Sequence, residues 1–143
     1  MNKQEIAALY DSAERQWQSR KFLNQDIGMI DKTFQGYIAA FAGNVAAGGL
    51  LMAAAVFHSQ KEAVKDRRLL ADAINEMLKE NQLLGEKQNR YGKSLLDTVR
   101  LTGPNWRHQA ALKEKVLGCA LALKHTLREF EVGQISKQKE GNE

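Results

Sequence analysis

Hydrophobic side chains recur at three- and four-residue steps along most of this chain, which is the spacing of one face of an α-helix. The first such face lies within residues 2–23 and is formed by Ile6, Leu9, Tyr10, Ala13 and Trp17. We therefore predict an amphipathic helix there. The pattern breaks over residues 24–28, where we expect a loop, and Asp31 is a residue type that caps the N-terminus of a following helix.

A stretch without formal charge follows, over residues 33–60. It is long enough to cross a bilayer, which takes about 20 apolar residues, so a membrane-spanning helix is one interpretation. Insertion into lipid is opposed by the amides of Gln35 and Asn44, by the pair Gly48-Gly49 and by an apolar content made largely of alanine. We favour two buried helices, 33–47 and 50–60, separated at the glycine pair because glycine adopts a positive φ freely. Their larger side chains are then expected to fill the core: Phe34, Tyr37, Phe41, Leu50, Leu51, Met52 and Phe57.

Amphipathic spacing returns in the second half of the chain and predicts a helix over residues 61–82. Residues 84–90 are polar and include a glycine, which indicates a loop. A short helix is expected over 91–101, ended by the glycine and proline that follow. The last predicted helix, 106–131, begins after Asn105 as its N-cap, and Gly133 is a suitable C-cap.

These elements predict an all-α fold, a compact single-domain bundle of about six helices over residues 1–132. Proline occurs once, at Pro104, and helix-forming residues are plentiful, so we expect no strand. Residues 133–143 are polar and are expected to form a flexible tail.

The charge and the lone cysteine narrow the class of protein further. A formal net charge of +4 gives a mild bias towards polyanionic partners. Cys119 cannot form an internal disulfide, and the first residues lack the apolar core of a signal peptide. We therefore expect the protein to reside in the cytoplasm.

Candidate catalytic chemistry is sparse. The histidines His58, His108 and His125 have no cysteine or carboxylate at metal-ligand spacing, and Cys119 falls within an apolar stripe, where a reactive thiolate is not expected. The glycines form no phosphate-binding loop motif. We predict neither catalytic residues nor a metal or cofactor.

Basic side chains lie at helical spacing in two places. Lys61, Lys65 and Arg68 follow one face of the predicted fourth helix. Lys113, Lys124 and Arg128 do the same on the last helix. Either set could follow the phosphates of a nucleic acid, but carboxylates lie near both, and a solvated face with local ion pairs is the alternative.

The stretch from Tyr37 to Phe57 resembles the signature helices of the small subunit of type III-B CRISPR effector complexes, the Cmr-type RNA-guided assemblies. In that family an aromatic-led helix reaches an Asn-Gly-Leu break before a second apolar helix ending in Ala-Phe, and here Gly48-Gly49-Leu50 stands at the break.

A second part of the resemblance lies near the end of the chain. Trp106-Arg107, Ala110, Glu114 and Lys124-His125 are similar to the family's aromatic-Arg start, its Ala and Glu, and its closing basic pair. The spacing between the Arg and the Glu is longer than in the family, and an expected Trp is absent. The two parts cover residues 34–82 and 95–130, roughly half of the chain.

The resemblance implies a non-catalytic subunit whose copies stack head-to-tail inside the complex, contact its other subunits and line the path of the guide–target RNA duplex. The side chains expected to meet that duplex are Lys61, Lys65, Arg68, Arg107, Lys113, Lys124, His125 and Arg128.

Stacking would also need two different protein-binding surfaces. The candidates are Leu117 and Leu121, among charges on the last helix, and Trp17 and Phe22, beside Arg20 and Lys21; each pair is equally compatible with the core or scattered exposure. A membrane-anchored helical protein, the small subunit of a sibling CRISPR type and a generic helical adaptor remain alternatives.

Overall fold

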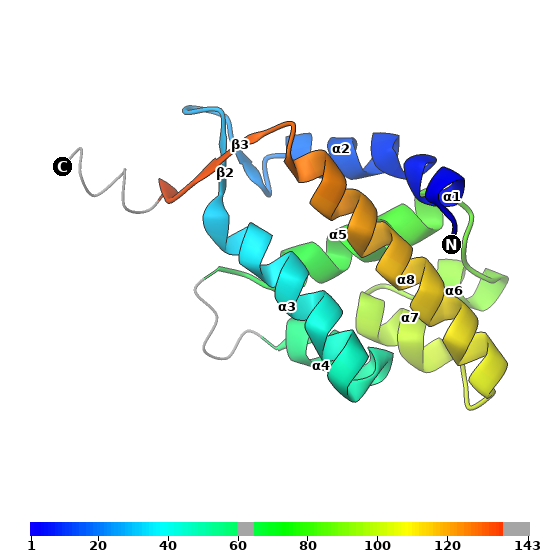
Figure 1. Ribbon diagram of the computed structural model, residues 1–143. Helices are drawn as coiled ribbons and strands as arrows, with labels where there is room; N and C mark the ends of the chain where they lie inside the picture. Colours follow the sequence, from blue (N-terminus) through cyan, green and yellow to red (C-terminus); the bar gives the residue numbers. More distant parts are fainter. Residues whose placement is uncertain (60–64, 136–143) are drawn as a thin grey trace.

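The computed structural model describes residues 1–59 and 65–135. Its longest helix, α8, runs diagonally across the molecule, and the other long helices pack around it (Figure 1). The helices in contact with it are α1 (Lys3–Ala7), α2 (Tyr10–Gln18), α3 (Lys32–Gly48) and α5 (Arg68–Glu80), with α8 itself spanning Trp106–Leu127. The predicted mostly helical architecture is confirmed.

The N-terminal part contains two helices where the periodicity predicts one over residues 2–23. A reciprocal cap starts α1, because the Asn2 side chain accepts from the Glu5 N–H and the Glu5 carboxylate accepts from the Asn2 N–H. Extended backbone at Ser19 ends α2. The chain then returns to the core at Phe22, which is 4% exposed.

A small three-stranded sheet lies at one end of the molecule (Figure 1). β1 (Leu23–Asn24) pairs antiparallel with β2 (Met29–Asp31), which pairs in parallel with β3 (Glu131–Gly133). The prediction of no strand is therefore wrong, and so is the assignment of Gly133 as a helix cap. Strands of two and three residues are too short to show the alternation by which a sequence reveals them.

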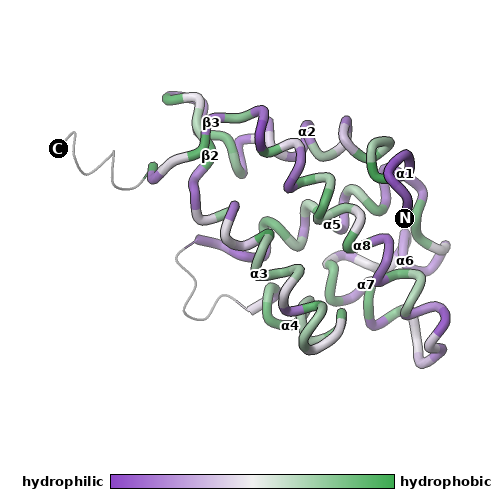
Figure 2. Tube along the Cα trace, in the orientation of Figure 1, coloured by the Kyte–Doolittle hydropathy of each residue, from purple (hydrophilic) through white to green (hydrophobic). Residues whose placement is uncertain are grey.

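The uncharged stretch folds back on itself as predicted. Asp31 caps α3, since its carboxylate accepts from the Thr33 N–H at 2.8 Å, and Gly49, at φ 87°, separates α3 from α4 (Leu50–His58). Only one side of each helix is buried, however, although much of both is coloured hydrophobic in Figure 2. Leu51 and Met52, expected in the core, are 54% and 59% exposed.

No helix in the described ranges 1–59 and 65–135 is long and apolar enough to cross a membrane. Three aromatic residues of the stretch, Phe34, Tyr37 and Phe57, pack edge to face in a chain that begins at Phe22. Ring centroids lie 5.0 Å apart for Phe22 and Phe34, 6.0 Å for Phe34 and Tyr37, and 6.1 Å for Tyr37 and Phe57.

The segment between α4 and α8 differs from its prediction in three places. The helix predicted over residues 61–82 begins at Arg68 as α5. Lys61, the first of the predicted basic residues, lies outside the described residues. α6 (Glu86–Tyr91) replaces the predicted loop; the Gln88 side chain accepts from the Gly85 N–H at 3.0 Å and so caps it. α7 (Leu95–Leu101) is shorter than predicted.

A buried polar network joins α5 to α7. The Asn75 amide donates to the carbonyl oxygen of Gly92 at 3.0 Å, and its oxygen accepts from the Thr98 hydroxyl at 2.7 Å. Asn75 is 3% exposed and Thr98 is fully buried, so each of these groups depends on the others for its hydrogen bonds.

The predicted cap of the last helix is confirmed, because the Asn105 side chain accepts from the Arg107 and His108 N–H groups at 2.9 and 3.3 Å. α8 ends at Leu127, earlier than predicted, and the chain turns there to enter β3.

Candidate nucleic-acid interface

The outward side of α8 carries a continuous stripe of residues at steps of three and four. Its members are Trp106, Ala110, Lys113, Leu117, Leu121, Lys124 and Arg128. All are exposed except Leu117, which is half-buried. One side of α8 therefore carries both the cationic side chains and the two leucines that were predicted at a subunit interface.

α3 lies beside α8 and runs antiparallel to it (Figure 1). At one end, the first turns of α3 and the last turns of α8 enclose a groove of about 450 Å³, with Gln35 and Ala39 facing Lys124 and Arg128. At the other end, the glycines between α3 and α4 border a second groove that Lys113 lines. We call the surface formed by Gln35, Ala39, Lys113, Leu117, Leu121, Lys124 and Arg128 the α3–α8 face.

The α3–α8 face carries three cations, and the exposed Glu114, which borders it next to Lys113, is paired with the N-terminal ammonium of Met1. α3 has no Asp or Glu anywhere in its sequence, and the stripe on α8 has none either. Lys113 and Arg128 are 15 residues apart, about 22 Å along the helix. One strand of a nucleic-acid duplex carries a phosphate roughly every 3 Å of axis, so the face can span several phosphates.

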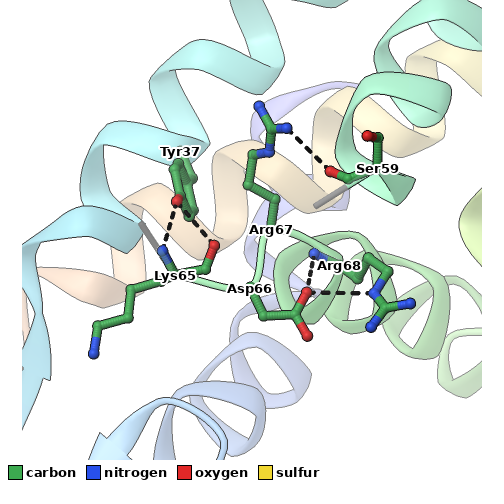
Figure 3. Close-up of polar contacts among 6 residues, drawn as sticks. All are labelled: Tyr37, Ser59, Lys65, Asp66, Arg67 and Arg68. Atoms are coloured by element: carbon green, nitrogen blue, oxygen red, sulfur yellow. Dashed lines mark hydrogen bonds and ion pairs between the residues drawn. The ribbon is translucent and has the colours of Figure 1, made fainter. Parts of the chain in front are cut away.

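The basic residues before α5 occupy a different environment (Figure 3). The Lys65 ammonium lies 3.7 Å from the buried carboxylate of Asp31, and the Tyr37 hydroxyl bonds both the N–H and the carbonyl oxygen of Lys65 at 3.0 Å. Arg68 Nε lies 3.4 Å from Asp66 Oδ1. These contacts pair both cations locally, and the structure does not place them on the α3–α8 face.

Two further predicted residues of α8 lie on another side of the helix. His125 is half-buried, with Nδ1 2.7 Å from the Tyr10 hydroxyl and the two rings edge to face, so it packs against α2 and is not on the outer face where the sequence places it. Arg107 is exposed, and its guanidinium lies 5.3 Å from the centre of the Trp106 ring.

The aromatic residues expected at a subunit interface are core residues. Trp17 is fully buried and Phe22 is 4% exposed, with ring centroids 4.9 Å apart. The basic residues Arg20 and Lys21, which suggested a surface, are both exposed in the turn after α2. Trp17 and Phe22 therefore cannot form an exposed docking site, whereas Leu121, at 36% exposed, remains on the surface.

Three residues that border the two grooves, Arg100, Gln35 and Ala39, were not predictable as site residues. Nothing in their local sequence distinguishes them, since only the packing of α3 beside α8 and of α7 against α4 brings them to these positions. Trp106 directly follows the N-cap of α8 and is 70% exposed.

The single cysteine of the chain does not lie in a setting that activates a thiol. Cys119 is buried in α8, and burial raises the pKa of its thiol to about 12, so it stays protonated at neutral pH. In the parts of the chain that the structure describes, no three His, Cys, Asp or Glu side chains are grouped so as to hold a metal ion.

The fold and this face describe a small helical protein with a cationic surface. Comparison with known proteins gives no match to a family model, to a curated protein or to a solved structure.

Proposed function

We propose that this protein is a non-catalytic, cytoplasmic subunit of a type III-B CRISPR effector complex that binds the backbone of the guide–target RNA duplex and acts in several stacked copies. The resemblance of residues 37–57 and 106–125 to the small subunit of that family motivates the assignment. The observation that carries the binding role is the α3–α8 face, where three cations lie along about 22 Å of helix and the neighbouring carboxylate, Glu114, is paired with the N-terminal ammonium of Met1.

The residue types of the face suit contact with a phosphate backbone. Lys113, Lys124 and Arg128 would neutralise phosphates and release counterions, which gives an affinity that depends on salt and not on sequence. The small side chains of α3 next to them, such as Ala39, leave room for a bulky ribose-phosphate chain. In an RNA-guided complex base pairing reads the target, so a sequence-independent contact is what such a subunit needs to supply.

Co-purification tests the proposal. The affinity-tagged chain is expressed together with the genes that neighbour its own, isolated under native conditions, and its bound proteins and RNA are identified. We expect a guide RNA and larger partner subunits. Recovery of the chain with proteins but no RNA would favour a generic helical adaptor, and recovery only in a detergent-extracted membrane fraction would favour a membrane protein; either result contradicts the proposal.

A further inference from the structure

A second groove, of about 560 Å³, lies where the turn between α3 and α4 meets the end of α7 and the start of α8. Leu51 and Trp106 line it, and they are 54% and 70% exposed. Met52 is 59% exposed and its side chain lies against Gly48, which also lines the groove, so three of the large exposed hydrophobic side chains of the described residues gather at this place. Such a concentration of apolar and aromatic surface is typical of a protein-binding site.

The charge of this groove points to the chemistry of its partner. Arg100 and Lys113 line it, and no Asp or Glu is among the described residues that do. The exposed Leu51 and Trp106 make much of this groove apolar, so the groove fits a protein segment better than RNA. That segment should present an apolar side chain next to a carboxylate.

The chain itself presents such a segment, at the turn between β1 and β2. Ile27 is 45% exposed at this turn, and its neighbour Asp26 is exposed as well. The side-chain oxygen of Asn24 accepts from the N–H groups of Asp26 and Ile27 at 3.0 and 3.4 Å, and Gly28, at φ 65°, completes the turn. The tip is thus held in shape before binding, which lowers the entropic cost of docking.

The tip and the groove lie at opposite ends of the molecule (Figure 1). One copy therefore cannot fill its own groove, and contact between two such different surfaces joins copies head to tail. From this complementarity we infer that the groove binds the Asp26–Ile27 tip of a second copy, with Ile27 against Leu51 and Trp106 and Asp26 facing Arg100. The inference rests on the stacking part of the proposed function and names the surfaces that stack.

Disulfide trapping tests the contact. A full-length chain carrying Ile27→Cys and Leu51→Cys is oxidised, both at high concentration alone and within the co-purified particle. We expect a ladder of linked dimers, trimers and longer species, because each copy offers both a tip and a groove. A mixture of the two single variants should stop at dimers. The native Cys119 is buried and does not compete.

A matched control replaces Leu51→Cys by Tyr91→Cys, because Tyr91 is 57% exposed on α6 and does not line the groove. Any one of three results would overturn the inference. They are the absence of a ladder with Ile27→Cys and Leu51→Cys in both settings, an equal ladder with the control pair, and linkage of Leu51→Cys to another protein. A charge exchange adds a second readout: Asp26→Arg should reduce linkage about two- to five-fold, and Arg100→Asp in the same chain should restore it.

The two proposals fail separately. A ladder without any bound RNA would support the tip-in-groove contact and contradict the proposed function. RNA and partner subunits without the ladder would support the function and place the stacking surfaces elsewhere on the molecule.

Discussion

The indole N–H of Trp17 donates a hydrogen bond of 2.9 Å to the backbone carbonyl oxygen of Leu123, in the centre of the protein. The Thr126 hydroxyl donates to the same oxygen at 3.3 Å. Both Trp17 and Leu123 are fully buried, so the bond joins α2 to α8 where neither group can reach water. The position of α2 on α8 thus depends on a polar contact as well as on packing.

We expect Trp17→Phe to lower the free energy of unfolding by about 2–4 kcal/mol. The change removes a buried hydrogen bond and leaves space in the core, and each effect costs roughly 1–2 kcal/mol. Denaturant unfolding followed by circular dichroism measures it. Trp106→Phe is the matched control, because Trp106 is 70% exposed, and it should change stability by no more than about 0.5 kcal/mol. Equal effects of the two changes would contradict this account.

Periodicity predicted those parts of the fold in which one helical face meets the core over several turns. The apolar stripe of α8 is an example, since Leu112, Val116, Cys119 and Leu123 are all buried as their spacing indicates. Helix ends marked by local chemistry were also predictable: Asp31 and Asn105 cap α3 and α8, and Gly49 separates α3 from α4.

What the sequence could not reveal depends on contacts between distant segments. β2 and β3 pair across about a hundred residues, and strands of three residues carry no pattern of their own. α6 forms from polar residues because the Gln88 side chain makes two stabilising hydrogen bonds. Its oxygen accepts from the Gly85 N–H and so caps the helix, and its amide nitrogen donates to the Thr102 hydroxyl at 2.8 Å. For the site, spacing placed Lys113, Lys124 and Arg128 together, but only the packing of α3 beside α8 defines the grooves next to them.

Gly92 lies in a position that tolerates no side chain. A Cβ there would collide with the carbonyl oxygen of Gln88 and the Thr98 hydroxyl, both held by other hydrogen bonds. We expect Gly92→Ala to destabilise the protein by about 1–3 kcal/mol, as overpacking of a core does. Thermal or denaturant unfolding measures the change.

Gly36 provides the opposite case for comparison. It lies within α3, and a Cβ there would meet no atom within 4 Å. Gly36→Ala should therefore stabilise the protein by about 0.5–1 kcal/mol, because alanine favours the helix and restricts the unfolded chain. A loss of stability in Gly36→Ala comparable to that in Gly92→Ala would show that the crowding at Gly92 is not the cause.

Cys119 should not react with thiol reagents while the protein is folded. Burial raises its pKa to about 12, so at pH 8 the reactive thiolate is scarce and is also inaccessible. Because the raised pKa favours the neutral thiol in the folded state, the thiol contributes stability at neutral pH that is lost as the pH rises from the ordinary value of 9.0 towards 12. Mass spectrometry after alkylation at pH 8 measures the reaction; rapid labelling without denaturant would contradict the buried position.

The RNA-binding role of the α3–α8 face predicts a specific response to charge reversal. Lys124→Glu with Arg128→Glu should weaken target RNA binding by the assembled complex, because two phosphate contacts turn into repulsions. The slope of the logarithm of the affinity against the logarithm of salt concentration should fall by about 0.7–0.9 for each phosphate that the variant no longer neutralises. Filter binding or fluorescence anisotropy over a salt series measures both effects.

The matched control reverses two charges of the same sign on another side of the molecule. Lys87 and Arg90 are exposed on α6, which is not part of the α3–α8 face, so Lys87→Glu with Arg90→Glu changes the net charge equally. Long-range attraction depends on net charge and falls off over about 10 Å at 0.1 M salt, whereas direct contacts depend on position. An equal loss of affinity in both variants would therefore show a general charge effect, and unchanged affinity in the α8 variant would show that RNA meets a different surface.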